Sequence, residues 1–178
     1  MHRVGAATDT AAHRMDSATA GTEKRGGWTD ASILGFTRAA NMGEVEEGRL
    51  GERKATNPAV KAYARQIVAD HQALLTEGQT LARKITVAAD TTADDVRDVM
   101  KSSRDEVKDL TDKKPGRDWD EDFVEKQIDG HKKVLDKLQD AAKNTTNADL
   151  RAALEKASGK VQQHLTKAQD LKDNQLKA

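Results

Sequence analysis

Apolar residues recur at helical spacing from Trp28 onward, and the positions between them are polar or charged. A period near 3.6 residues is typical of helices that bury one face. The pattern predicts helices over residues 29–55, 58–85, 92–113, 118–143 and 148–174. No segment shows the sustained alternation of apolar and polar residues that marks a strand, so the sequence predicts an all-α protein.

The two prolines of the chain stand where a helix is expected to begin or end. Asn57 followed by Pro58 is typical of an N-cap with proline in the first helical turn. Pro115 follows two lysines and is followed by glycine, which predicts the end of the preceding helix. Asp118 with Glu121 three residues later predicts a capping box at the start of the next one.

The spacing of these helices indicates their topology. Short turns join the first two helices and the last two, so each pair is expected to fold back as a hairpin. Helix 92–113 then carries the chain from one hairpin to the other, and its own apolar stripe lets it pack on them. Two hairpins and one crossover predict an antiparallel four-helix bundle with an additional helix, the ferritin-like arrangement.

Composition divides the chain at about residue 27. Residues 1–27 are rich in Ala, Thr, Asp and Gly without a helical period, so we expect a flexible N-terminal tether there. Residues 28–175 are expected to form a single helical-bundle domain. No apolar run in the chain has the length of a membrane span or of the apolar core of a secretory signal.

Charge and cysteine content exclude several classes of site. The 30 basic and 30 acidic residues cancel, which argues against a nucleic-acid or anionic-membrane surface. The absence of cysteine excludes disulfides, thiolate metal sites and thiol nucleophiles. No catalytic Ser/His/Asp set, phosphate loop or nucleotide fingerprint is visible. The sequence identifies no protein partner, and its candidate chemistry lies in histidine and glutamate.

Three histidines fall within the apolar stripes of their helices: His71, His131 and His164. One inward histidine is more often a hydrogen-bonded core residue than a metal ligand. Three inward histidines on three helices, however, rarely arise by chance. Counting residues from the two hairpin turns, at about 1.5 Å per residue, puts all three near one level of the bundle.

The first helix supplies a carboxylate at the same level. Glu44 lies on the shoulder of its apolar stripe and Glu47 points along it, and we take Glu44 as the ligand with Glu47 as the alternative. Three imidazoles and one carboxylate suit zinc, iron, nickel or copper better than calcium or magnesium. We therefore expect one divalent transition metal, zinc or iron, with Gln127 as a partner of His131 in the outer shell.

The residues around these side chains also resemble a known family. The segments GEVEEGRLGERKATNPAVKAYARQIVADHQALL and FVEKQIDGHKKVLDKLQDAAKNTTNADLRAALEKASGKVQQHLTKAQDL are similar to the bacterial domain-of-unknown-function family 4142, which is grouped with ferritin-like proteins. Two positions depart from its pattern, Glu47 where the family is usually apolar and Gly130 where it is usually acidic. The resemblance implies a ferritin-like bundle and a periplasmic or cell-envelope location, with no established biochemical role.

Three functions remain open from the sequence. The first is a non-catalytic metal-binding bundle of the bacterial cell envelope, acting in metal handling or stress. The second is a metal-free structural or partner-binding bundle whose histidines hydrogen-bond to one another and to glutamate. The third, and least favoured, is a mononuclear metal enzyme. A di-iron centre is not expected because Val68, Ile128 and Val161, three residues before the histidines, replace the glutamate of Glu-x-x-His.

Overall fold

The computed structural model describes residues 27–176 and contains five helices. They are α1 (Asp30–Lys54), α2 (Pro58–Ile85), α3 (Asp94–Asp112), α4 (Arg117–Asn144) and α5 (Ala148–Asn174). The predicted helices are confirmed, and no end differs from its prediction by more than two residues. No strand occurs in the described part of the chain. The predicted tether lies almost wholly outside it.

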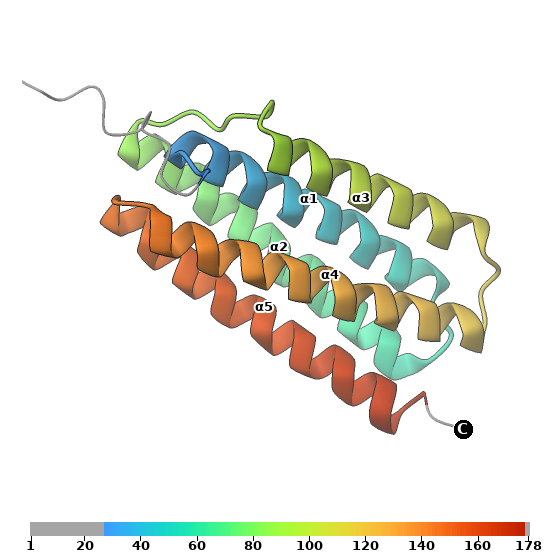
Figure 1. Ribbon diagram of the computed structural model, residues 1–178. Coiled ribbons are helices and arrows are strands. Elements are labelled where there is room, and N and C mark those ends of the chain that lie inside the picture. The colour runs from blue at the N-terminus through green and yellow to red at the C-terminus, as the bar shows by residue number, and fades with distance from the viewer. Residues whose placement is uncertain (1–26, 177–178) are drawn as a thin grey trace, which may run out of the picture.

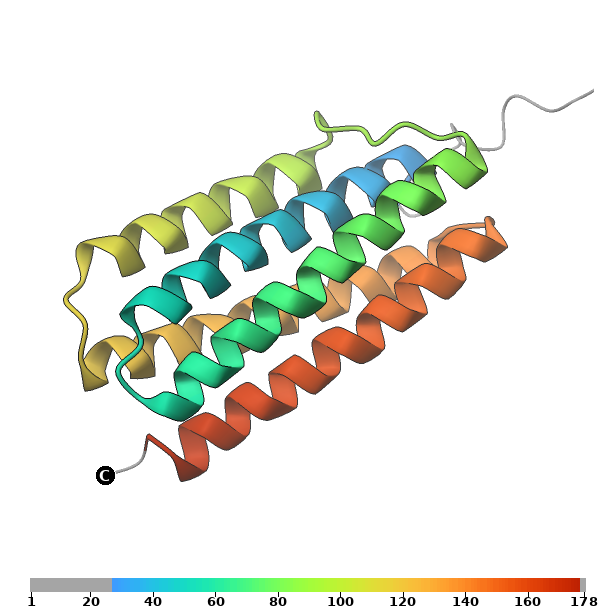
Figure 2. The ribbon, with the colours of Figure 1, turned by 180° about the vertical axis from the view of Figure 1, so that it is seen from behind.

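The helices form a bundle of two hairpins (Figure 1). Helices α1 and α2 pair over most of their length, as do α4 and α5, and α2 lies beside α5 while α1 lies beside α4. Helix α3 packs mainly on α1 and returns the chain to the start of α4, as Figure 2 shows from behind. The predicted plan of two hairpins and a crossover helix is therefore confirmed, and its relation to ferritins stays a prediction.

Glycines in α1 let two neighbouring helices approach it closely. A Cβ atom on Gly51 would lie 2.7 Å from the Cβ of Ala64 in α2, and one on Gly48 would lie 2.8 Å from Val68. A Cβ on Gly43 would lie 2.3 Å from the hydroxyl oxygen of Ser103 in α3, a contact that no side chain tolerates. Glycine costs a helix roughly 1 kcal/mol relative to alanine, and here that cost permits close packing.

The α1–α2 turn is held as expected, whereas the start of α4 differs from its prediction. The side chain of Asn57 accepts hydrogen bonds from the first turn of α2, as predicted for an N-cap. Helix α4 begins at Arg117 after Gly116, and no side chain caps it. The predicted capping box is therefore wrong, because Asp118 already lies inside the helix and Glu121 instead accepts from Arg117 at 2.7 Å.

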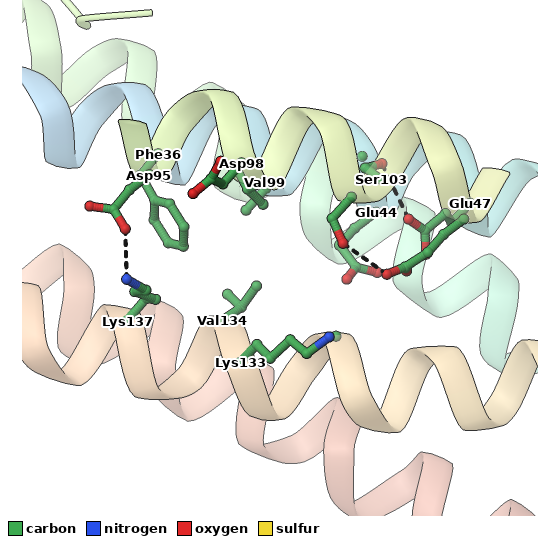
Figure 3. Close-up of a pocket in the computed structure, with 15 residues that line it drawn as sticks. Phe36, Glu44, Glu47, Asp95, Asp98, Val99, Ser103, Lys133, Val134 and Lys137 are labelled. Carbon is green, nitrogen blue, oxygen red and sulfur yellow. Dashed lines mark hydrogen bonds and ion pairs between the residues drawn. The ribbon is translucent and has the colours of Figure 1, made fainter. Parts of the chain in front are cut away.

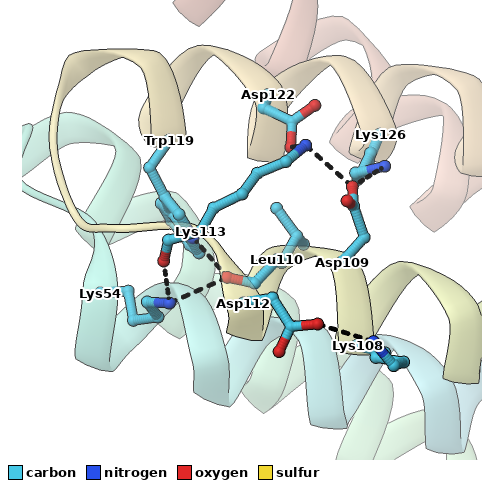
Figure 4. Close-up of polar contacts among 9 residues, drawn as sticks. All are labelled: Lys54, Lys108, Asp109, Leu110, Asp112, Lys113, Trp119, Asp122 and Lys126. Carbon is cyan, nitrogen blue, oxygen red and sulfur yellow. Dashed lines mark hydrogen bonds and ion pairs between the residues drawn. The ribbon is translucent and has the colours of Figure 1, made fainter.

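The end of α3 is fixed to both α1 and α4 (Figure 4). The ammonium group of Lys54 donates to the carbonyl oxygens of Leu110 at 2.9 Å and Thr111 at 2.7 Å, and also to that of Lys113. The indole N–H of Trp119 donates to the carbonyl of Leu110 at 2.8 Å. A cation at a helix C-terminus is favourable because the unpaired carbonyl groups carry partial negative charge. These contacts hold α3 against the bundle at this end.

Across the described residues, none of the helices combines the length and apolar character needed to cross a bilayer.

Candidate metal centre

Three buried histidine rings from three helices meet in one layer of the bundle. His71 comes from α2, His131 from α4 and His164 from α5. Their ring centroids lie 5.1 to 5.8 Å apart, and no ring is more than 3% exposed. One nitrogen from each ring lies within 4.8 Å of the other two. The structure therefore brings together the three histidines that the sequence predicted to share a level.

Two of the rings each donate the N–H of Nδ1 to a neighbouring oxygen of the protein. The Nδ1 of His71 lies 2.7 Å from Oδ1 of Asn41, and the Nδ1 of His131 lies 2.8 Å from the backbone carbonyl oxygen of Gln127. Both partners are acceptors, so Nδ1 carries the proton in each ring. A neutral imidazole has only one N–H, which leaves both Nε2 atoms with a free lone pair.

The third ring is held from the opposite nitrogen. The Nε2 of His164 lies 2.8 Å from Oδ2 of Asp70, and Oδ1 of that carboxylate lies 3.4 Å from the ammonium group of Lys160. Partial burial acts to raise the pKa of Asp70, but the hydrogen bond with His164 and the charge of Lys160 hold it below its usual value. The ionised carboxylate accepts the proton of Nε2, so the lone pair of His164 lies on Nδ1.

Two of the three remaining lone pairs face each other, and the third belongs to His71, whose ring centroid lies within 5.8 Å of the other two. The Nε2 of His131 and the Nδ1 of His164 are 3.4 Å apart, and neither carries a proton in this arrangement. The Nε2 of His71 is buried and has no hydrogen-bond partner. An unpaired buried polar atom costs about 1–3 kcal/mol, and facing lone pairs repel. A cation bound among the three nitrogens removes both penalties.

Burial also keeps these rings neutral. It lowers the pKa of His131 to about 4, although the hydrogen bond to Gln127 acts to raise it. Burial lowers the pKa of His71 well below its ordinary value and that of His164 below it as well. At neutral pH no proton therefore competes for the three lone pairs, which is the state that a metal ligand requires.

Glu44 lies next to this group but not within it. Its Oε1 is 3.6 Å from Nδ1 of His131, the nitrogen that already donates to Gln127, and its Oε2 accepts from the side-chain amide of Gln127 at 3.1 Å. Burial raises the pKa of Glu44 to about 7, although Gln127 and His164 act to lower it. The carboxylate therefore lies on the Nδ1 side of the His131 ring and not on the Nε2 side.

Glu47, the alternative carboxylate, contacts none of the histidines. Its Oε2 accepts from Gln127 at 3.0 Å and its Oε1 accepts from the hydroxyl of Ser103 at 3.2 Å. Of the four predicted ligands, the structure thus groups the three histidines, and ligation by Glu44 stays a prediction. The expected contact between Gln127 and His131 is confirmed, although the backbone carbonyl makes it.

Asn41 and Asp70 are functional candidates that the sequence analysis did not assign. Asn41 is a polar residue beside the apolar stripe of α1, and Asp70 directly precedes His71, so each carried a weak signal. Helical periodicity places Asp70 at the border of the buried face of α2, but its bond to His164 on α5 depends on how the two helices pack. Both supply the oxygen that orients a histidine toward the centre.

A family model described as "Domain of unknown function (DUF4142)" matches residues 12–171, which is most of the chain. No curated protein and no solved structure matches the chain. The arrangement of the three histidines is therefore the principal guide to its chemistry.

Proposed function

We propose that this chain, which belongs to the DUF4142 family of domains of unknown function, binds one divalent transition-metal ion through His71, His131 and His164. The observation that carries the proposal is the convergence of three unprotonated nitrogens, each on a ring whose other nitrogen donates to the protein. This pattern of a ligand imidazole fixed by an outer oxygen is general in metal sites.

The donor set favours a transition metal, and among these we propose zinc or iron. Imidazole nitrogen suits zinc, iron(II), nickel and copper, whereas calcium and magnesium take oxygen ligands. Asp70 and Glu44 lie behind His164 and His131, so two carboxylates stand beside the ligand rings and balance the charge of a dication. In this proposal Glu44 acts on His131 rather than on the metal, because it lies at Nδ1 and the lone pair lies at Nε2.

The centre suits a structural or storage role better than catalysis. The rings are at most 3% exposed, so a substrate has little access to a metal bound between them. The ligands join α2, α4 and α5, and a metal would therefore tie both hairpins together. We accordingly propose metal handling or stress protection, and we propose the bacterial cell envelope as its location.

Elemental analysis tests this proposal. Protein purified without added metal, then exposed to a mixture of zinc and iron(II), should retain about one metal ion per chain after gel filtration. His131→Ala should abolish this retention, because it removes one of three nitrogens, while His164→Gln should reduce it. Metal content below a tenth of an equivalent in the wild-type chain, or full content in His131→Ala, would contradict the proposal.

One observation favours a metal-free alternative. The 3.4 Å separation of the ring nitrogens of His131 and His164 also fits a hydrogen bond, if one extra proton sits between them. That state needs a charged imidazole, and burial acts against it by lowering the pKa of both rings. The same elemental analysis decides between the two, since a proton-bridged bundle retains no metal.

A further inference from the structure

A cavity of about 300 Å³ lies between α1, α3 and α4, apart from the three histidines (Figure 3). Its walls include the apolar side chains of Phe36, Ala40, Val99 and Val134. The volume is at the lower end of the range found for small-molecule sites, about 300–1,000 Å³. A ligand with an aliphatic portion would thus find both room and apolar surface here.

Two buried carboxylates close one end of this cavity. Glu44 is 9% exposed and Glu47 is 4% exposed, and in the described part of the chain neither pairs with a lysine or arginine. Glu47 is held by Ser103, and Gln127 donates to both carboxylates. Burial raises the pKa of each, and for Glu47 the neighbouring charges of Glu44 and Glu106 raise it further, so without a cation the pair binds protons instead. An ammonium group beside these oxygens would favour their ionised form.

One carboxylate oxygen is left without a hydrogen bond and faces open space. Among the described residues no hydrogen bond to Oε1 of Glu44 is found, and this oxygen lies 3.6 Å from the Nδ1 of His131. Gly130 of α4 lines the cavity opposite this oxygen, and a Cβ on that glycine would lie 3.9 Å from it. The absence of a side chain at Gly130 keeps the space beside the carboxylate free for a donor group.

The remaining lining makes the cavity acidic. Its acidic members are Glu44, Glu47, Asp95, Asp98 and Glu106, and its basic members are Lys133 and Lys137. Lys137 is already bound to Asp95 at 2.6 Å, and Lys133 is exposed. Five carboxyl groups against two lysines give this site an acidic excess in a chain with no net charge. A bound cation favours the ionised form of these groups, so the site suits cations and not anions.

We propose that this cavity binds a short aliphatic diamine in its doubly protonated form. One ammonium group lies against Glu44 and Glu47, the alkyl chain lies along Phe36, Val99 and Val134, and the second ammonium group lies at Asp98 near the opening. Asp98 and Ser103 are five residues apart in α3, which is about 7.5 Å along the helix. This span matches an extended chain of about five carbons.

A hydrated metal dication fits the same cavity less well. Magnesium requires six oxygen ligands in near-octahedral geometry, whereas the buried end offers two carboxylates that already accept from Gln127. The apolar walls give a metal ion nothing to bind. An alkyl chain, in contrast, is stabilised by that surface in proportion to the area it buries.

Isothermal titration calorimetry on the full, metal-free chain at neutral pH and low salt tests the proposal. Cadaverine should bind with one-to-one stoichiometry, and pentylamine should bind at least about tenfold more weakly because it lacks the second charged contact. Magnesium chloride at equal ionic strength should not displace cadaverine. Zinc-loaded protein should bind cadaverine more weakly, because Glu44 lies beside both cations. Metal-free His164→Gln should still bind cadaverine one-to-one, so the failure of either proposal is seen without the other.

Variants locate the two ammonium groups. Glu47→Gln should weaken cadaverine and pentylamine alike by about tenfold or more. Asp98→Asn should weaken cadaverine alone, and because Asp98 is exposed this variant should fold normally, as circular dichroism will check. Glu155→Gln, an exposed residue of α5, is the matched control and should change neither affinity. Three results would overturn the proposal. They are the absence of any heat of cadaverine binding to the wild type, equal affinity for the two amines, and displacement of cadaverine by magnesium.

Discussion

At the scale of single residues, the orientation of each histidine ring is decided by one oxygen atom. Asn41 accepts from His71, the carbonyl of Gln127 accepts from His131, and Asp70 accepts from His164. Each hydrogen bond fixes the proton on the ring nitrogen that faces the acceptor, and leaves the lone pair on the other nitrogen, toward the centre of the site. The oxygens around the site therefore matter as much to metal binding as the nitrogens in it.

Asp70→Asn should weaken zinc binding by about tenfold. Asparagine keeps an oxygen that can accept from His164, but it removes the negative charge that makes the imidazole a stronger donor. The dissociation constant is measured by competition with a chromophoric chelator. Asp149→Asn, an exposed change of equal charge, serves as control; equal affinities for the two variants would remove Asp70 from the outer shell.

Glu44→Gln should stabilise the metal-free chain at alkaline pH. The folded state raises the pKa of Glu44 from 4.5 to about 7, so below pH 4.5 the group is protonated whether folded or unfolded and has no effect. As the pH rises through 7 the unfolded chain ionises more easily, and the wild type loses stability by about 3 kcal/mol. Glutamine keeps the bond to Gln127 without this loss.

Urea unfolding with a chelator present, at pH values below 4.5 and above 7, measures the difference. The free energies of unfolding of wild type and Glu44→Gln should agree in acid and diverge in base. Glu155→Gln should follow the wild type throughout. An equal difference at both ends of the range would show that burial of the Glu44 charge is not its cause.

At the scale of helices, α1 is the element on which the others pack, and its glycines set the distances. Gly51→Ala should destabilise the fold by about 1–3 kcal/mol, because the added methyl would lie 2.7 Å from Ala64 and 2.9 Å from Phe123. Gly159→Ala in α5 meets no atom within 4 Å and should instead stabilise by about 0.5–1 kcal/mol. Urea unfolding compares them, and a stabilised Gly51→Ala would show that the α1–α2 spacing is not tight.

At the scale of the whole molecule, the metal would join helices from both hairpins. Zinc at about a hundred times its dissociation constant should stabilise the folded chain by about 2.7 kcal/mol, which raises the melting temperature by about 5–10 °C. Thermal melts followed by circular dichroism, with and without zinc, measure the shift. The His131→Ala variant should have the same melting temperature with and without zinc. If zinc raises its melting temperature as much as that of the wild type, zinc binds at another site.

The amino-acid sequence by itself determined the helices and the inward direction of the three histidines. Both follow from local rules: the apolar period states which face of each helix is buried, and Asn57, Pro58 and Pro115 mark ends that depend on nearby backbone groups. The level of each histidine could also be counted from a turn, because the rise per residue is constant. The start of α4 was misplaced by one residue because the cap depends on the geometry of Gly116 rather than on residue type.

Only the tertiary structure decided which atoms meet. The side of His131 on which Glu44 lies, the bond from His164 to Asp70, and the cavity beside Gly130 depend on helix rotation, helix spacing and side-chain rotamers. Periodicity gives a direction around one helix axis, but a hydrogen bond between two helices requires positions accurate to a few tenths of an ångström. Close packing of the whole bundle sets those positions, and no segment contains that information alone.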